Sequence, residues 1–205
     1  MYGSKLVTAI GVHLYYVFVS VGVGFVIAVF LGILLSRIPQ YANYILPVIS
    51  IFQTIPGIVF IGILFLYLGM LPITVITALT IYAIFPVLKN TFVGILEVDA
   101  SYKEAARGCG MSDLQVLLKI ELPLAMPTIF AGLRMATIYT VSWAVLASMI
   151  GLGGLGEFIY IGVATNNNRL IIAGAIPAAI MAVCLSYLID LLQKTITPRG
   201  LRKVN

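Results

Sequence analysis

The chain has 205 residues, a length that suits a single domain. Hydrophobic residues make up 61% of it and charged residues only 9%, against about 25% charged in ordinary soluble domains. So much apolar surface excludes a small soluble protein and predicts a chain that lies in lipid. The net charge of +5 does not indicate nucleic-acid binding, because the basic residues are scattered at the ends of apolar stretches rather than clustered on one face.

The first apolar stretch is too long for a signal-peptide core, and it predicts a retained membrane span at about 12–36. Gly22, Gly24 and Gly32 suit close helix packing, which in lipid depends on small interface residues. His13 lies near the start of the span. We expect a satisfied interfacial histidine there rather than a proton relay, because no carboxylate lies nearby in the sequence.

The next 51 residues, 38–88, carry no charge and are long enough for two spans. We place these spans at about 42–68 and 73–95, because Gly69 to Pro72 supplies a break between them. Prolines within these spans predict kinks, where neighbouring helices or water satisfy the freed backbone groups. These prolines are Pro47, Pro56 and Pro86.

A charged segment, 89–121, follows and holds nine of the nineteen formal charges. Ser101 with Glu104, and Ser112 with Gln115, have the spacing of capping boxes. The segment is therefore predicted to contain two short helices, one starting near each serine.

Glycines and prolines mark the limits of these short helices. Gly108 and Gly110 are expected to end the first helix and form the turn, since glycine takes left-handed backbone angles without penalty. Pro123 is expected to end the second helix and Pro127 to start the next. One face of the second helix is apolar, which predicts that it lies against something apolar. That face carries Leu114, Leu117 and Leu118.

Two more spans complete the chain, at about 124–150 and 170–192. Between them, 151–169 is expected to form an extracytoplasmic re-entrant or surface segment. Its run Gly151–Gly156 matches the dinucleotide pattern G-x-G-x-x-G, but it follows a long hydrophobic helix rather than a strand, so we reject that function. Thus the fold class is an all-α integral membrane protein with five transmembrane helices.

Few charges fall inside these last spans. Arg134 lies one or two turns from the charged segment, so we expect it to reach the interface. Asp190 is expected to pair with Lys194, four residues later.

Polar, aromatic and proline positions in the spans are candidates for lining a translocation path. Tyr139 and Trp143 stand one helical turn apart, and such a pair could attract a cationic ligand by cation–π interaction. Plain packing, an interfacial aromatic belt or ordinary interhelical hydrogen bonding are the alternatives. The candidate path residues are Gln53, Thr54, Pro56, Tyr82, Tyr139 and Trp143.

The distribution of basic residues predicts the orientation. Five spans put the two termini on opposite sides, and the basic residues, Arg134 apart, divide nine to two. By the positive-inside rule, the charged segment and the C-terminus are cytoplasmic and the N-terminus is outside. The nine are Arg37, Lys89, Lys103, Arg107, Lys119, Lys194, Arg199, Arg202 and Lys203, and the two are Lys5 and Arg169.

The charged segment resembles the EAA loop of permease subunits of ATP-binding-cassette importers. In that family the loop, here about 97–121, is a cytoplasmic coupling helix that docks into a groove of the ATPase subunit. The alternative is a purely structural role, in which Glu104 only caps a helix and Gly110 only makes a turn. The matching residues are Glu104, Ala105, Ala106, Gly110, Ile120, Leu122 and Pro123.

Four further runs are similar to permeases of the glycine betaine/carnitine/choline uptake systems, a branch of the type I importers. They are 51–56, 84–91, 151–157 and 196–200. The resemblance implies a dimer with a second permease copy or paralogue, an ATPase dimer, and an extracytoplasmic substrate-binding protein that is lipid-anchored or periplasmic. It also implies a multi-pass protein of the bacterial inner or plasma membrane, working by alternating access.

No catalytic, cofactor-binding or metal site is expected in this chain. It has no GxxxxGK[ST] or HExxH pattern, so ATP and Mg²⁺ are expected in the partner ATPase and the chain itself is not an enzyme. Cys109 and Cys184 have no disulfide or metal spacing. The alternatives are an importer for another small zwitterion such as ergothioneine, an ion-coupled carrier or channel, and a structural or assembly subunit.

Overall fold

A computed structural model describes residues 2–197, and helices make up nearly all of this part of the chain. The predicted all-α class is confirmed. Two short segments interrupt the α-helices: the π-helical turn η1 at Leu117–Glu121, and η2 at Ser148–Leu152, in which the chain bends at Gly151 (φ +91°). The α-helices are α1 Tyr2–Ser36, α2 Pro39–Thr54, α3 Gly57–Leu68, α4 Pro72–Leu96, α5 Ala100–Gly108, α6 Asp113–Val116, α7 Leu122–Ala147, α8 Leu155–Ala164 and α9 Asn168–Ile196.

Four stretches are long and apolar enough to cross a membrane: α1, α4, the run from α6 through α7, and α9. A fifth span exists if α2 and α3 count as one, although they meet at 90°. The described chain therefore has four spans, or five with the bent pair. Arg199, Arg202 and Lys203, which entered the predicted charge asymmetry, lie outside the described residues.

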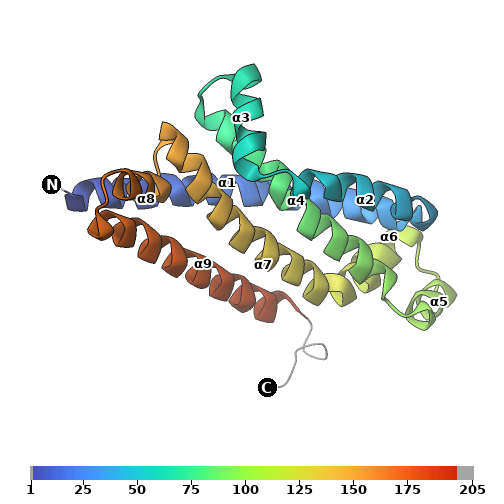
Figure 1. Ribbon diagram of the computed structural model, residues 1–205. Helices are drawn as coiled ribbons and strands as arrows, with labels where there is room; N and C mark the ends of the chain where they lie inside the picture. The colour runs from blue at the N-terminus through green and yellow to red at the C-terminus, as the bar shows by residue number, and fades with distance from the viewer. Residues whose placement is uncertain (1, 198–205) are drawn as a thin grey trace.

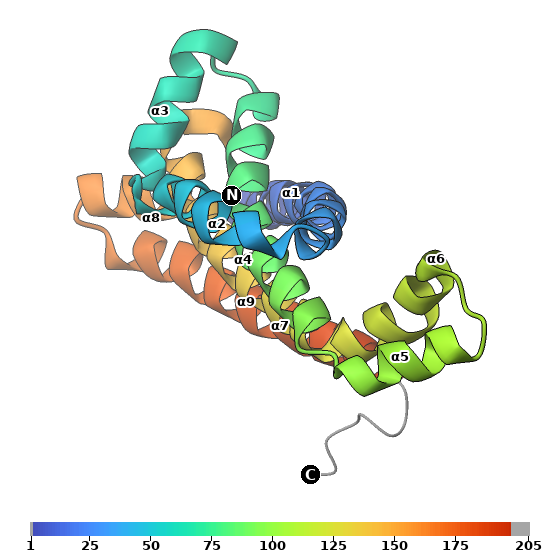
Figure 2. The ribbon, with the colours of Figure 1, turned by 90° about the vertical axis from the view of Figure 1, so that its right-hand side faces the viewer.

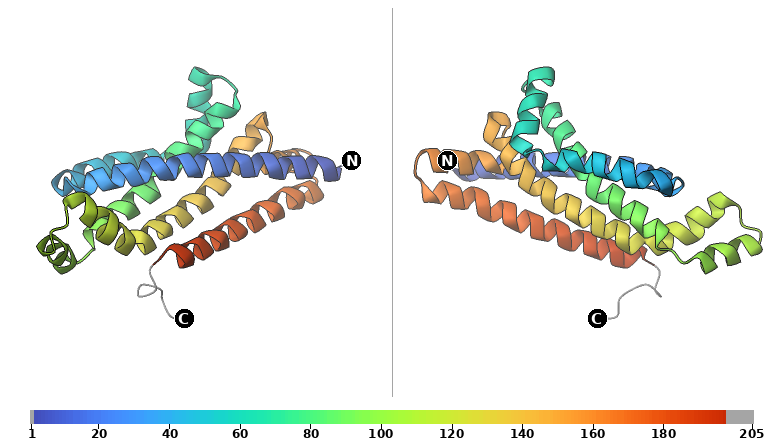
Figure 3. Two further views of the ribbon diagram at one scale, coloured as in Figure 1. Left: turned by 180° about the vertical axis from the view of Figure 1, so that it is seen from behind. Right: turned by 45° about the vertical axis from the view of Figure 1, so that its right-hand side comes forward.

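Helix α4 is the centre of the bundle. It packs mainly against α1 and α7 and also contacts α2 and α3, whereas α9 contacts chiefly α7 and α8. In the most apolar 18-residue window of each helix, 56% of the residues are buried in α4 but only 17% in α9. Figure 1 and the two views of Figure 3 show α9 along the outside of α7, so one side of α9 is open to lipid or to another subunit.

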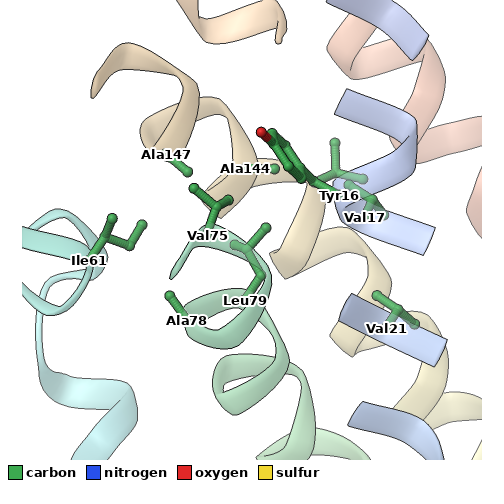
Figure 4. Packing of buried hydrophobic residues seen from close by; sticks show 10 residues of the cluster. Tyr16, Val17, Val21, Ile61, Val75, Ala78, Leu79, Ala144 and Ala147 are labelled. Carbon is green, nitrogen blue, oxygen red and sulfur yellow. The ribbon is translucent and has the colours of Figure 1, made fainter. Parts of the chain in front are cut away.

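The main apolar cluster lies where α1, α4 and α7 meet and is joined by α3 (Figure 4). Small residues on α4 and α7 bring the backbones close, and larger side chains from α1 and α3 fill the remaining space. The cluster consists of Tyr16, Val17, Val21, Ile61, Val75, Ala78, Leu79, Val141, Ala144 and Ala147.

Two of the three glycines predicted to pack α1 do so. A Cβ placed on Gly32 would lie 2.7 Å from Cβ of Thr91, and one on Gly24 would lie 3.0 Å from Cβ of Ala83. Both neighbours belong to α4, so these glycines set the close approach of the two helices. Nothing lies within 4 Å of the same position at Gly22, which does not contribute to this contact.

His13 is enclosed by protein. Its side chain is fully buried between α1 and α7, and Nε2 lies 3.2 Å from the carbonyl oxygen of Val141. Because α1 begins at Tyr2 and α8 covers its first turns, this histidine packs inside the protein, which the sequence alone does not reveal.

The span predicted at 42–68 contains a sharp break. Pro56 restricts Ile55 to extended angles (φ −71°, ψ 125°), and Pro56 itself is extended before Gly57 begins α3. Two extended residues separate helices that meet at 90°. In Figure 1, α3 and the start of α4 project beyond the other helices as a result.

Charged residues near the end of the last span pair differently from the prediction. Nη2 of Arg134 lies 2.7 Å from Oδ1 of Asp190, so the expected pair of Asp190 with Lys194 is wrong. The same nitrogen donates to Oε1 of Gln193 at 3.4 Å. Because α7 and α9 pack side by side, a neighbouring helix offers Asp190 a cation that sequence spacing does not reveal.

Candidate coupling loop and translocation path

Helices α5 and α6 stand at one end of the molecule, away from the long helices (Figure 2). The start of α1 and helix α8 lie at the opposite end (Figure 1). Four of the matched EAA residues, Glu104, Ala105, Ala106 and Gly110, therefore lie at one end of the molecule, on α5 and the turn that follows it.

The N-terminus of α5 is capped by Asp99, not by Ser101. Oδ1 of Asp99 accepts a hydrogen bond from the backbone N–H of Ser101 at 2.8 Å, which lowers the pKa of this carboxyl. Ser101 is already inside the helix, so the predicted capping box with Glu104 is wrong. Glu104 is exposed and has no capping role, which leaves its carboxylate available to a partner.

Gly110 forms the turn after α5. The N–H of Met111 donates to the carbonyl of Ala106 at 3.1 Å, and that of Gly110 donates to Arg107 at 2.9 Å. These bonds make a Schellman motif, and Gly110 takes the left-handed φ of +81° that the motif requires. Gly108 is the last helical residue instead, so only one of the two predicted turn glycines makes the turn.

Helix α6 begins with the predicted capping box, which is confirmed. The N–H of Ser112 donates to Oε1 of Gln115 at 2.9 Å, and the N–H of Gln115 donates to Oγ of Ser112 at 3.4 Å. An ion pair of 3.1 Å between Arg107 and Asp113 links the two short helices across the turn.

The prediction that Pro123 ends one helix and Pro127 starts the next is wrong. The helix continues from α6 into α7 through the π-helical turn η1, in which the N–H of Leu122 donates to the carbonyl of Leu117. Pro123 has no N–H to donate, and a wider turn accommodates this loss without ending the helix. The α5–α6 element is thus joined to α7 by continuous helix.

The matched residues divide into an exposed and a buried group. Glu104, Ala105 and Gly110 are exposed, whereas Ala106 is buried. The second half of the pattern is half-buried at the junction with α7: Ile120, Leu122 and Pro123.

The apolar face predicted for α6 is open. Leu114 and Leu118 are exposed on it, as is Tyr102 on α5, while Leu117 is half-buried. Exposed apolar side chains at the tip of a projecting element are typical of a protein contact surface.

The break between α2 and α3 carries a second cluster, built around Tyr82 of α4. The Tyr82 hydroxyl donates to the carbonyl oxygen of Ile55 at 2.8 Å, which satisfies a backbone group freed by Pro56. Nε2 of Gln53 donates to the carbonyl oxygen of Tyr82 at 3.4 Å. Phe60 meets the Tyr82 ring edge-on, with centroids 5.4 Å apart.

Trp143 of α7 completes this cluster. Its indole stacks on Tyr82 with centroids 4.8 Å apart and planes 13° from parallel. A Cβ on Gly57 would lie 2.0 Å from Cε3 of Trp143, so only glycine leaves room for the indole at the start of α3. The cluster therefore joins the helix break to α4 and α7.

Three of the six predicted path residues meet in this cluster: Gln53, Tyr82 and Trp143. Thr54 bonds within its own helix, to the carbonyl of Ile51, and is exposed together with Pro56 and Tyr139. Sequence reasoning missed Gly57 and Phe60, although the Pro-Gly pair at the break was a usable signal.

No group of three or more His, Cys, Asp or Glu side chains in residues 2–197 is arranged to hold a metal ion. Cys109 and Cys184 are both free and exposed.

Comparison with known proteins gives the family. Residues 22–201 match the model of the binding-protein-dependent transport system inner membrane component. The carnitine transport permease protein OpuCB of Listeria monocytogenes is 38% identical over 98% of this chain and 92% of its own. The glycine betaine/carnitine/choline transport system permease protein OpuCB of Bacillus subtilis is 37% identical over the same shares.

Solved structures agree on the fold. A chain of the MetNI methionine ABC transporter in an inward-facing conformation superposes with a TM-score of 0.81 and 23% identity, covering 95% of this chain and 97% of that one. The predicted type I importer permease fold is thereby confirmed. The chain belongs to the family of binding-protein-dependent transport system inner membrane components and is a multi-pass protein of the bacterial inner membrane.

Proposed function

We propose that this chain is the permease subunit of an ATP-driven importer for a quaternary-ammonium compatible solute: glycine betaine, carnitine or choline. Relatives that are 36–38% identical are permeases of carnitine, glycine betaine/carnitine/choline and choline transport systems, which supports this substrate class. The observation that carries the proposed coupling is the position of the EAA residues. The first four lie on a capped, projecting helical element, and exposed side chains at this end of the molecule include Glu104, Leu114 and Leu118.

In this proposal the α5–α6 element docks into a groove of an ATP-binding-cassette ATPase. Leu114, Leu118 and Tyr102 supply apolar contact, and Glu104 supplies a charge. The element is therefore cytoplasmic, and the N-terminus of α1 is outside. ATP and Mg²⁺ bind to the ATPase dimer, which drives alternating access in a pair of permease chains.

The translocation path in this proposal passes the break between α2 and α3. Tyr82 and Trp143 supply aromatic surface there, which suits a quaternary ammonium group through cation–π attraction. Gln53 adds a polar group, and an extracytoplasmic binding protein delivers the solute.

Co-purification after gentle solubilisation tests the assignment. The wild-type chain should retain an ATP-binding-cassette subunit, and Gly110→Trp should lose it. Uptake of radiolabelled glycine betaine, carnitine and choline by cells that carry the whole operon, but no other osmolyte importer, then identifies the solute. A stable complex without any ATPase would instead favour a carrier or channel.

A further inference from the structure

A buried carboxylate lies at the junction between the coupling element and the bundle. Glu121 is the last residue of η1, and its side chain is only 2% exposed. Burial of a charged side chain costs free energy unless the charge is paired and hydrogen-bonded. The burial of Glu121 therefore requires an explanation.

Two cations from different parts of the chain meet this carboxylate. Arg37, which follows α1, binds both oxygens: Nη1 donates to Oε1 at 3.2 Å, and Nη2 pairs with Oε2. Lys103 of α5 places Nζ 3.7 Å from Oε1 and donates to the carbonyl of Ile95, in α4, at 3.2 Å. Glu121 therefore joins α5 to the ends of α1 and α4 and to the start of α7.

The helix geometry helps to bring Glu121 to this position. A π-helical turn contains an extra residue, which rotates the side chains after it by about 100° relative to an uninterrupted α-helix. A π-helical turn is a local distortion that contacts elsewhere must stabilise. Here the paired carboxylate of Glu121 lies at the end of the turn.

The junction is also the main route by which α5 touches the bundle. The principal packing partners of α5 are α6 and η1. A displacement of α5 by an ATPase would therefore reach Glu121 by two routes: through η1, which ends at Glu121, and through the pair of Lys103 with Glu121.

We propose that Glu121 is a positioning residue for transport, which transmits movement of α5 to α1 and α7 through its pairs with Lys103 and Arg37. This role rests on the proposed function, because it requires an ATPase docked on α5–α6. The EAA pattern does not include it: Glu121 is the variable position between Ile120 and Leu122.

The test uses the complete transporter, with its ATPase and binding protein, in proteoliposomes. Glu121→Gln keeps the shape but removes the charge, and it leaves a half-exposed Arg37 that water can solvate. We expect ATP hydrolysis to continue while the solute imported per ATP falls about threefold or more. Arg37→Lys, which keeps the charge, should retain more coupling than Arg37→Gln.

Lys194→Gln is the control for loss of a charge. Lys194 is an exposed cation of α9 and lies outside the α5–α6 element, so this change should leave the ratio of solute to ATP unchanged. If Glu121→Gln does not assemble, Lys103→Gln gives the answer, because it keeps the pair of Glu121 with Arg37. A wild-type ratio in an assembled Glu121→Gln or Lys103→Gln transporter would overturn the proposal.

A second readout needs no transported solute. In a chain with Cys109 and Cys184 replaced by serine, a cysteine at the exposed position Gln40 should change its maleimide labelling rate when ATP is added. Glu121→Gln should abolish this change, and an unaltered response would contradict the link. A wild-type chain that binds no ATPase would refute the proposed function instead.

Discussion

The indole of Trp143 lies flat on the phenol ring of Tyr82, with 4.8 Å between the ring centroids. The two residues come from α7 and α4, and the same phenol holds the carbonyl of Ile55 at the break between α2 and α3. A single stacked pair thus ties three parts of the bundle together.

Replacing Trp143 tests whether this pair serves transport. Trp143→Ala should slow transport by about twofold to tenfold, the range expected from one lost aromatic pair, and more than it lowers expression. Trp143→Phe should restore part of the rate. The measurement is initial uptake normalised to chain in the membrane. Tyr139→Ala, at an exposed position one turn away, is the control, and equal losses of rate and expression would indicate packing alone.

Gly57→Ala should destabilise the protein by about 1–3 kcal/mol, as expected for overpacking. Its methyl group would fall 2.0 Å from Cε3 of Trp143 and force the indole off Tyr82. The melting temperature in detergent should fall. Gly62 lies in the same helix, and a Cβ added there meets nothing within 4 Å, so Gly62→Ala should have the melting temperature of the wild type. Equal melting temperatures of the two variants would refute this packing.

The contact between α1 and α4 gives a second matched pair. Gly32→Ala should separate the helices at Thr91 and cost about 1–3 kcal/mol. Gly22→Ala meets nothing within 4 Å and should be neutral or slightly stabilising, because alanine favours helix more than glycine does. Thermal unfolding followed by tryptophan fluorescence compares them, and a lower melting temperature for Gly22→Ala would be the contrary result.

At Gly110, backbone strain and bulk can be separated. Gly110→Asn should keep the Schellman turn, since asparagine tolerates the left-handed φ, and should lose little ATPase binding. Gly110→Trp adds both backbone strain and a bulky side chain, and it should lose most of the ATPase binding. Gly108→Trp, in the last helical residue, controls for bulk without a left-handed φ. Pull-down of the ATPase measures all three, and retention by Gly110→Trp would exclude docking at this turn.

Glu104→Lys should weaken ATPase association without lowering the melting temperature of the chain. Its carboxylate is exposed and makes no cap, so the charge reversal changes only what a partner meets. Binding of the purified ATPase to nanodiscs gives the affinity. An unchanged dissociation constant would mean that Glu104 does not contact the partner.

The sequence predicted features that depend on local chemistry. The capping box of Ser112 and Gln115 and the turn at Gly110 follow from the conformations that these residues prefer. The all-helical class follows from long apolar runs that lipid accommodates only as helix or barrel.

Features that depend on distant neighbours escaped prediction. Asp190 pairs with Arg134, 56 positions earlier in the chain, rather than with the nearby Lys194, because α7 lies beside α9. Pro123 was predicted to end a helix, but a π-helical turn absorbs its missing N–H. Tyr82 bonds to the freed carbonyl of Ile55, and only the packing of α4 against the break reveals this partner.

The pair of Arg134 with Asp190 has a consequence for biogenesis. Each of α7 and α9 alone carries a charge in a long apolar helix, and such a charge raises the free energy of entering lipid. Side by side, the two helices present a neutral pair. Helix α9 is therefore expected to leave the insertion machinery together with α7, so that the two charges enter lipid as a pair.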